Sequence, residues 1–380
     1  MGMERKDPAE YLDVLRGLSA YVVLFYHTYQ ILFQRLTSVD HPLTLPFDIA
    51  GHYAVVIFFL LSGYLITGSI RSNIARNGRF DVIDYLAARI ARIYPPLIGA
   101  LIICAAVWGV IVLFDLPGRV AHGAPTDLWQ VQRYYGFEWS EFFTALLMYY
   151  GLYIADRPLW TLYIEFQMYI AAIGVAIWFG QNRFRGSWSV VAFVALFLAM
   201  KQHLWAATWL MGSVANLSPF GRTTAKRIAI VLLPLIVLVA IFDPRLLIFS
   251  KRSDVMQLVV CLFFCCVIFF VPPYWKYPTW LVRSANHSYS LYVIHWPLLL
   301  LALSLTQDWM GSSPWRTLAA GAGAALAISL FSARFAAVLE QHAYFKKRML
   351  ALMARFRLRW RELLDSAGRA EAHDAERVND

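Results

Sequence analysis

The sequence predicts an all-α, polytopic integral membrane protein. Apolar residues make up 59% of its 380 residues, and mean hydropathy is +0.53. Charged residues account for only 15%, whereas soluble domains carry about 25%. The apolar residues are grouped into runs, several of them close to the roughly 20 residues that cross a bilayer. Because lipid offers the backbone no hydrogen-bond partners, such runs are expected to cross as helices.

Ten of these apolar runs are expected to be transmembrane helices. They cover residues 11–33, 51–70, 96–114, 159–179, 188–200, 204–217, 228–242, 257–271, 287–305 and 315–339. The fifth and sixth runs are short and weakly separated, so their boundaries are the least defined. A further run at residues 142–154 is too short to span comfortably and is predicted to form an interfacial or re-entrant helix.

Residues 1–345 are therefore expected to form one transmembrane domain. The segment 346–380 is rich in basic residues, short, and poor in apolar residues. It cannot bury a core of its own, so we expect a charged cytoplasmic tail that is disordered or held at the membrane surface.

The distribution of charge predicts the orientation of the chain. With the N-terminus in the cytosol, 24 of the 34 Lys and Arg residues fall on the cytoplasmic side. The positive-inside rule then favours a cytoplasmic location for both termini. The net charge of +10 is explained in the same way, and the absence of zinc-finger or RNA-binding motifs argues against a nucleic-acid partner. The four cysteines lie in apolar runs without paired spacing, so no metal site is predicted.

Two ionisable residues in the first span are candidates for chemistry, since burying such groups in a bilayer is costly. Arg16 and His27 are eleven residues apart, which is about 16 Å along a helix and close to three full turns. Both therefore face the same side, with Asp13 within reach of an ion pair to Arg16. An imidazole is the side chain best suited to accept a proton near neutral pH.

Other charged residues extend this pattern. Arg89 and Arg92 are three residues apart, so they share a helical face at the cytosolic surface. Two guanidinium groups there could clamp a phosphate, although a plain positive-inside anchor is the alternative. Glu165 is a carboxylate in an apolar helix and needs a partner or a proton. His295 is a second intramembrane imidazole, and Pro297 frees a backbone carbonyl beside it.

Together these groups predict a polar tunnel through the bilayer. The residues expected to line it are His295, Trp160, Tyr163, Tyr292 and Ser62. Trp160 and Tyr163 also suit the external interface between the bilayer and water. Ser62 and its neighbour Gly63 are small and permit close helix packing, while Ser62 as a nucleophile lacks a local base.

These motifs, taken in order, resemble those of the acyltransferase-3 family of membrane O-acyltransferases. The matching motifs are Arg16-x10-His27, FFLLSGY at 58–64, Arg89-x-x-Arg92 with Pro95, Trp160-Thr161-Leu162 with Glu165 and Tyr169, and SYSLY at 288–292 with His295 and Pro297. One departure concerns the end of the last span, where the family often has Glu followed closely by Pro. Here Glu340 is followed by Gln341, so the family motif assigns no role to Glu340.

The resemblance implies a ten-helix, multi-pass protein of the bacterial cytoplasmic (inner) membrane. Such an enzyme takes an acyl group, commonly acetyl from acetyl-CoA, and delivers it to a hydroxyl of a glycan or glycolipid at the external face. This would make it a transferase that modifies a polysaccharide by O-acetylation. The resemblance also assigns residue roles: His27 is the catalytic residue, Arg16, Arg89 and Arg92 are required, and Glu165 and His295 line the site.

The mechanism expected from this resemblance joins an anionic cytosolic donor to an external acceptor. Arg89 and Arg92 would hold the nucleotide phosphates, Arg16 would guide the pantetheine arm or its phosphates, and His27 would act as general base. An acyl-His27 intermediate is a close variant, and Glu165 would orient an imidazole or bind acceptor hydroxyls. A proton-coupled transporter of a small solute is the alternative function, although no internal repeat pairs the two halves. A non-catalytic scaffold is a third.

Overall fold

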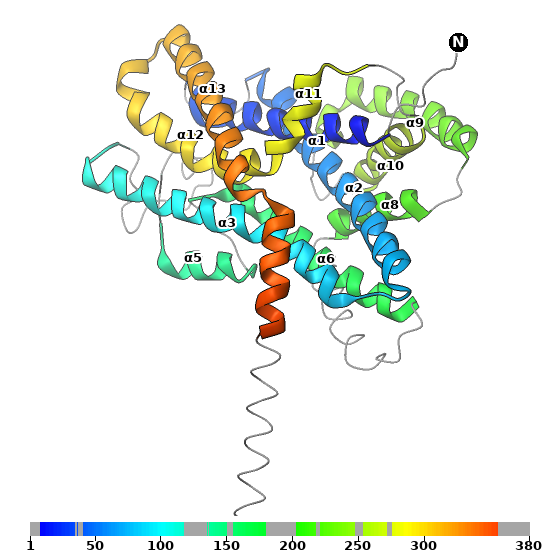
Figure 1. The fold of residues 1–380 in the computed structure, drawn as a ribbon. Helices are drawn as coiled ribbons and strands as arrows, with labels where there is room; N and C mark the ends of the chain where they lie inside the picture. The colour runs from blue at the N-terminus through cyan, green and yellow to red at the C-terminus, as the bar shows by residue number, and fades with distance from the viewer. Residues whose placement is uncertain are drawn as a thin grey trace, which may run out of the picture.

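The chain is built from helices. The computed structural model describes residues 8–34, 36, 41–117, 135, 137–149, 155–179, 203–217, 221–247, 254–271 and 276–355 (Figure 1). Helices account for all regular secondary structure in these ranges, and no β-strand occurs among them. The all-α prediction is confirmed.

Six helical segments are long and apolar enough to cross a bilayer. They are Thr44–Asn77, Val82–Leu113, Arg157–Ile177, Arg222–Phe242, Thr279–Met310 and Pro314–Arg355. Helix α10 (Asp254–Phe270) is apolar but shorter. These segments establish a multi-pass membrane protein, whereas the number ten and the orientation of the termini stay predictions. The span expected at 188–200 lies outside the described residues.

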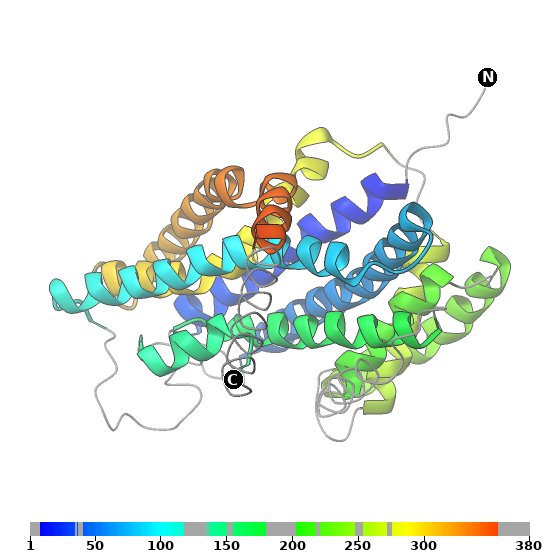
Figure 2. The same cartoon turned by 60° about the horizontal axis from the view of Figure 1, so that its bottom comes forward.

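Helix α1 (Pro8–Thr28) occupies the centre of the arrangement. It contacts α2 (Thr44–Asn77), α11 (Thr279–Ser284) and α12 (Ser288–Met310). Figures 1 and 2 show α12 and α13 (Pro314–Leu339) on one side of it and the pair α9 (Arg222–Phe242) and α10 on the other.

The end of α1 has unusual geometry. The helix continues as a π-helical turn, η1 (Tyr29–Phe33), in which the Gln34 amide donates to the Tyr29 carbonyl at 3.0 Å. Single π-helical turns occur frequently at functional sites. This one begins two residues after His27.

Helix α2 is longer than expected and packs tightly on α8 (His203–Leu217). The expected span 51–70 lies inside it, and the helix begins seven residues earlier. Gly63 of α2 and Gly212 of α8 allow the contact, because a Cβ at either position would overlap a backbone carbonyl of the facing helix. The Ser213 hydroxyl also donates to the Gly63 carbonyl at 3.2 Å.

Helix α3 (Val82–Leu113) begins well before the expected start at residue 96. Asp81 caps its N-terminus by accepting from the Asp84 amide at 3.0 Å. The expected span began at Pro96, so Arg89 and Arg92 were expected before it, at the cytosolic surface next to Pro95 and Pro96. The helix instead runs through both prolines, so the two arginines belong to α3 itself.

The remaining elements complete the bundle. Helix α5 (Trp139–Leu146) overlaps the start of the expected interfacial segment 142–154, of which residues 150–154 lie outside the described residues. The turn η2 (Arg157–Leu159) leads into α6 (Trp160–Phe179). The turn η3 (Pro244–Leu247) follows α9 (Arg222–Phe242) in the chain and precedes α10. The turn η4 (Ala285–His287) joins α11 to α12. Within the expected tail, residues 346–355 are helical.

Candidate active site

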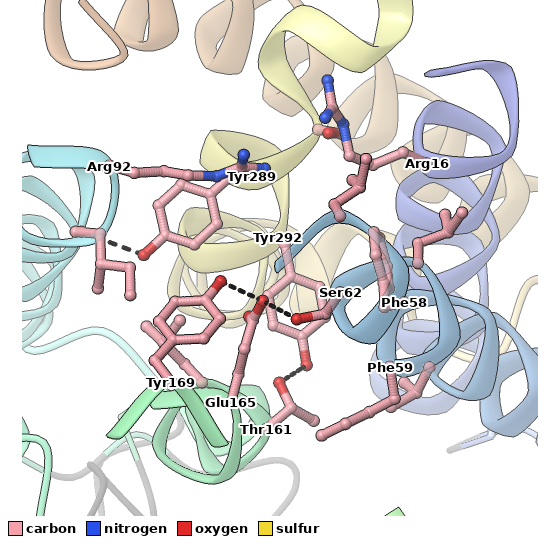
Figure 3. Close-up of a pocket in the computed structure, with 16 residues that line it drawn as sticks. Arg16, Phe58, Phe59, Ser62, Arg92, Thr161, Glu165, Tyr169, Tyr289 and Tyr292 are labelled. Atoms are coloured by element: carbon pink, nitrogen blue, oxygen red, sulfur yellow. Dashed lines mark hydrogen bonds between the residues drawn. The ribbon is translucent and has the colours of Figure 1, made fainter. Parts of the chain in front are cut away.

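A narrow cavity of about 90 Å³, here called the inner cavity, lies between α1, α2, α3, α6 and α12. Figure 3 shows Arg16 and Arg92 at one end of it and Thr161 at the other. Ser62 and Glu165 lie between these two ends. The inner cavity therefore combines cationic groups at one end with hydroxyl and carboxylate groups deeper inside.

Arg16 is fixed at its position by two contacts. Its Nη2 atom forms the predicted ion pair with Asp13 at 3.2 Å and donates to the Ala285 carbonyl at 3.3 Å. The charges closest to it also include Arg92 and Glu340. Two guanidinium groups beside one cavity favour an anionic occupant, since an anion between them would relieve their mutual repulsion.

The two arginines of α3 differ in their surroundings. Arg92 lines the inner cavity, whereas Arg89 is not part of its wall. Arg89 donates to the Ser69 hydroxyl at 2.9 Å, and its guanidinium carbon lies 5.5 Å and 5.7 Å from the ring centroids of Tyr85 and Tyr169. The structure thus brings Arg92, rather than the expected pair, together with Arg16 around the cavity.

Glu165 has the polar partners that its apolar helix requires. Its Oε1 atom accepts hydrogen bonds from the Ser62 hydroxyl at 2.8 Å and the Tyr169 phenol at 2.5 Å. The Ser62 oxygen accepts in turn from the Trp209 indole at 3.3 Å. Glu165 was expected either to orient an imidazole or to bind acceptor hydroxyls. None of the hydrogen bonds described for Glu165 involves an imidazole, so the geometry favours contact with a molecule in the inner cavity.

A second and wider cavity, here called the outer cavity, has a volume of about 390 Å³ and contains His27. Aromatic and ionisable side chains share its wall. Trp160 and Trp205 lie with ring centroids 5.1 Å apart, and Asp48 and Arg157 add a carboxylate and a guanidinium. Such a mixture of flat apolar faces and hydrogen-bonding groups suits a polar organic ligand.

His27 lies within a cluster of rings. Its ring centroid is 5.2 Å from that of His295 in a stacked arrangement and 4.9 Å from Trp296 edge-on. His295 is fully buried, and its Nδ1 donates to the Tyr292 carbonyl at 2.7 Å. The two predicted intramembrane imidazoles are therefore neighbours, although His295, which was expected to line the tunnel, lines neither cavity because it is buried behind His27 and Tyr292.

Tyr292 and Val55 line both cavities and form the wall between them. The Tyr292 hydroxyl is hydrogen-bonded to Thr161 at 2.6 Å and donates to the Pro158 carbonyl at 2.9 Å. A single helix, α1, contributes Arg16 to the inner cavity and His27 to the outer one. The site is thus two cavities separated by a thin partition.

Tyr163 does not line either cavity, although it was expected to line the tunnel. Its side chain is buried among Asp156, Cys104 and Glu141, because its position on α6 turns it toward α3 and α5. Its hydroxyl has no hydrogen-bond partner among the described residues. The sequence argument rested on the preference of Trp and Tyr for the membrane interface, which cannot distinguish Tyr163 from Trp160. Trp160 does line the outer cavity.

Several wall residues were not foreseen. Asp48 lies before the predicted second span and Arg157 before the predicted fourth, so neither was considered a site candidate. Gln30 and Tyr26 on α1 were overlooked. Tyr26 directly precedes His27, and Gln30 follows it by three residues, which is about one helical turn.

No metal site accompanies these groups in the part of the chain that the structure describes. Within it, no cluster of three or more His, Cys, Asp or Glu side chains could hold a metal ion. All four cysteines are free and buried.

The fold and the site define an integral membrane protein that encloses ionisable groups between its helices. Comparison with known families assigns the chain further: it belongs to the acyltransferase-3 family, whose profile, described as an acyltransferase domain, matches residues 9–334. The resemblance inferred from the motifs is confirmed.

Two curated relatives were found. The chain is 32% identical over 171 residues to an O-acetyl transferase of Shigella phage Sf6, covering 43% of this chain and 45% of that protein. It is 31% identical over 165 residues to a protein of Bacillus subtilis (strain 168) named, provisionally, as the peptidoglycan O-acetyltransferase YrhL. This match covers 42% of this chain and 23% of the relative. The aligned regions thus span less than half of each relative, and no solved structure matches the chain significantly.

Proposed function

We propose that this protein is an O-acyltransferase that moves an acyl group, in the first instance acetyl, from acyl-CoA in the cytosol to a hydroxyl of a glycan or glycolipid on the outer side of a bacterial inner membrane. The observation that carries the proposal is the meeting of two cavities at Tyr292, with Arg16 in one and His27 in the other. Membership of the acyltransferase-3 family and the names of both relatives support the type of reaction.

The inner cavity fits the chemistry of the donor. Coenzyme A carries phosphates, which Arg16 and Arg92 would bind as charge-assisted hydrogen-bond donors. Its pantetheine arm is thin and contains two amides, and a cavity of about 90 Å³ admits only such a chain. The Ser62, Glu165 and Tyr169 cluster would offer hydrogen bonds to those amides along the way.

The outer cavity fits the chemistry of a sugar acceptor. Trp160 and Trp205 present flat faces against which the apolar face of a pyranose ring can pack. Asp48 and Arg157 would hydrogen-bond sugar hydroxyls and so select the one that reacts. The name of the Bacillus relative, which specifies peptidoglycan, agrees with a carbohydrate acceptor.

His27 would supply general-base catalysis. It removes the proton from the acceptor hydroxyl as the oxygen attacks the thioester carbonyl, and the tetrahedral intermediate collapses by expelling the coenzyme A thiolate. The imidazolium of His27 then returns the proton to that sulfur. The Trp296 ring lies edge-on to His27, and its indole N–H has no acceptor among the described residues, so it is a candidate donor to the oxyanion.

The experiment uses purified protein in proteoliposomes with acetyl-CoA and oligosaccharides released from the surface glycan of the producing organism. Thiol release and mass analysis of the sugars measure transfer in the absence of any ion gradient. His27→Ala should lower the rate by at least about 10²-fold, the lower end of general-base contributions. His203→Ala is the control, because this exposed histidine pairs with Asp254 away from both cavities.

Two outcomes would contradict the proposal. One is full activity in His27→Ala. The other is the absence of thiol release combined with gradient-driven solute uptake, which the transporter alternative predicts.

A further inference from the structure

His27 is one end of a chain of hydrogen bonds that runs along the wall of the outer cavity. Its Nδ1 atom lies 2.8 Å from Gln30 Oε1, and Gln30 Nε2 donates to the Tyr26 hydroxyl at 2.5 Å. The Tyr26 phenol is in turn hydrogen-bonded to the Asp48 carboxylate. We propose that Gln30, Tyr26 and Asp48 are positioning residues that fix the tautomer and ring orientation of His27, an inference that rests on the function proposed above.

The donor and the acceptor of every hydrogen bond in this chain follow from its last residue, Asp48. An ionised carboxylate can only accept, so Tyr26 must donate its hydroxyl proton to Asp48. The Tyr26 oxygen is then free to accept from the Gln30 amide NH₂, which fixes the orientation of that amide. Its carbonyl oxygen therefore faces His27, and His27 must place its proton on Nδ1. The alternative amide orientation would leave Tyr26 unable to donate to Asp48.

This assignment leaves Nε2 of His27 as the basic nitrogen. The neighbouring imidazole cannot donate a hydrogen bond to that nitrogen, because His295 also carries its proton on Nδ1, which donates to the Tyr292 carbonyl. The Nε2 atom of His295 has no partner among the described residues. Two stacked imidazoles thus present lone pairs, and an acceptor hydroxyl is the group that can satisfy one of them.

The local fold accounts for the chain of bonds. Tyr26, His27 and Gln30 lie within about one turn of α1 and the start of its π-helical extension. Helix α2 brings Asp48 to Tyr26, and Gly51 of α2 makes room for the phenol ring. A Cβ at position 51 would meet the Tyr26 ring at 2.3 Å. The position of Tyr26 is therefore set by close packing, not only by hydrogen bonds.

The first test compares four variants in the transfer assay. Gln30→Leu removes the acceptor for Nδ1 and should lower kcat about 10- to 100-fold with KM within about 3-fold, since loss of a group that orients a catalytic residue typically costs this much. Gln30→Glu keeps an oxygen facing Nδ1 and should recover at least about 10-fold of that loss. Tyr26→Phe should cause a smaller loss in kcat. Tyr29→Phe, which removes a nearby phenol bonded to Thr44, should match the wild type.

These results separate the positioning role from the proposed function. Wild-type transfer that is lost in His27→Ala, together with unchanged kcat in Gln30→Leu, would refute the chain while leaving the function intact. A change in KM alone would refute it equally.

A second measurement does not depend on the folding of any Gln30 variant. Solid-state ¹⁵N NMR of histidine-labelled wild-type protein reports the tautomer, with the His27 signals identified by their loss in His27→Ala. A proton on Nδ1 is expected, and a proton on Nε2 would overturn the proposal.

Discussion

The contact between α2 and α8 gives the sharpest prediction about stability. Replacing Gly63 by Ala would place a Cβ 1.9 Å from the carbonyl oxygen of Trp209 and 3.0 Å from the Ser213 amide nitrogen. Real Cβ atoms essentially never approach a neighbour closer than 3.0 Å, so the two helices must separate by about 1 Å. The atoms in conflict belong to the backbone, which cannot rotate away as a side chain can.

The cost of that separation can be estimated. Overpacking of a tightly packed interior costs about 1–3 kcal/mol, and a backbone clash belongs at the upper end. We expect Gly63→Ala to lower the thermal unfolding midpoint in detergent by about 3–6 °C, followed through the fluorescence of the 14 tryptophans. The displacement should also weaken the hydrogen bond from Trp209 to Ser62.

Matched controls define what the result means. Gly212→Ala should behave like Gly63→Ala, because its Cβ would lie 2.0 Å from the Leu60 carbonyl oxygen. Gly109→Ala on α3 meets nothing within 4 Å and should leave the midpoint unchanged or slightly raised, since Ala is the better helix former. If Gly63→Ala and Gly109→Ala unfold at the same temperature, the described packing of α2 on α8 is wrong.

Three further predictions concern the cavities. Arg16→Ala should raise KM for acetyl-CoA about 10- to 100-fold with a smaller change in kcat, as loss of a charge-assisted hydrogen bond predicts. Steady-state kinetics at varied donor concentration would measure this effect, and an unchanged KM would contradict a donor-binding role. Glu165→Leu should destabilise the protein by about 2–3 kcal/mol because the hydroxyls of Ser62 and Tyr169 lose their acceptor. Glu165→Gln keeps an acceptor oxygen and should cost less than half as much. Equal unfolding midpoints for the two variants would count against this account. Tyr292→Phe should cost about 1–2 kcal/mol in unfolding free energy through its lost hydroxyl contacts, and a midpoint equal to the wild type would show that these contacts carry no net stability.

The fold class and the positions of several candidate site residues could be predicted because they depend on local patterns. Apolar runs and the positions of Arg16, His27 and His295 are visible in the sequence, and a spacing of about three turns places the first two on one face of α1. The proximity of His27 and His295 followed from the assumption that intramembrane ionisable groups share an interior. The structure places their rings 5.2 Å apart.

What could not be predicted depends on tertiary context. The predicted third span began at residue 96, yet α3 begins at Val82 and passes through Pro95 and Pro96. The Ala91 carbonyl, which Pro95 leaves without its helical partner, is hydrogen-bonded by His342 from beyond α13. Only the packed arrangement supplies that compensation. The two cavities were likewise expected as one continuous tunnel, because no local pattern reveals that Tyr292 is held between them by Thr161 and Pro158.

Glu340 shows the same limit of local patterns. Its sequence context differs from the usual family motif, which left its role open. In the structure its carboxylate accepts from the amide and the hydroxyl of Ser290. It therefore caps the first turn of α12, where unpaired amides need an acceptor. Two residues after Ser290 on that helix comes Tyr292.

The partition formed by Tyr292 and Val55 has a consequence for how a cell manages its coenzyme. In the proposed reaction the bulky nucleotide and the sugar never meet, since each is confined to its own compartment and they touch only through a thioester and a hydroxyl. The carrier is retained and can be recharged by metabolism, while a fragment of two carbons leaves. Export of an acetyl group thus requires neither a transporter for coenzyme A nor a supply of activated donor outside the cell.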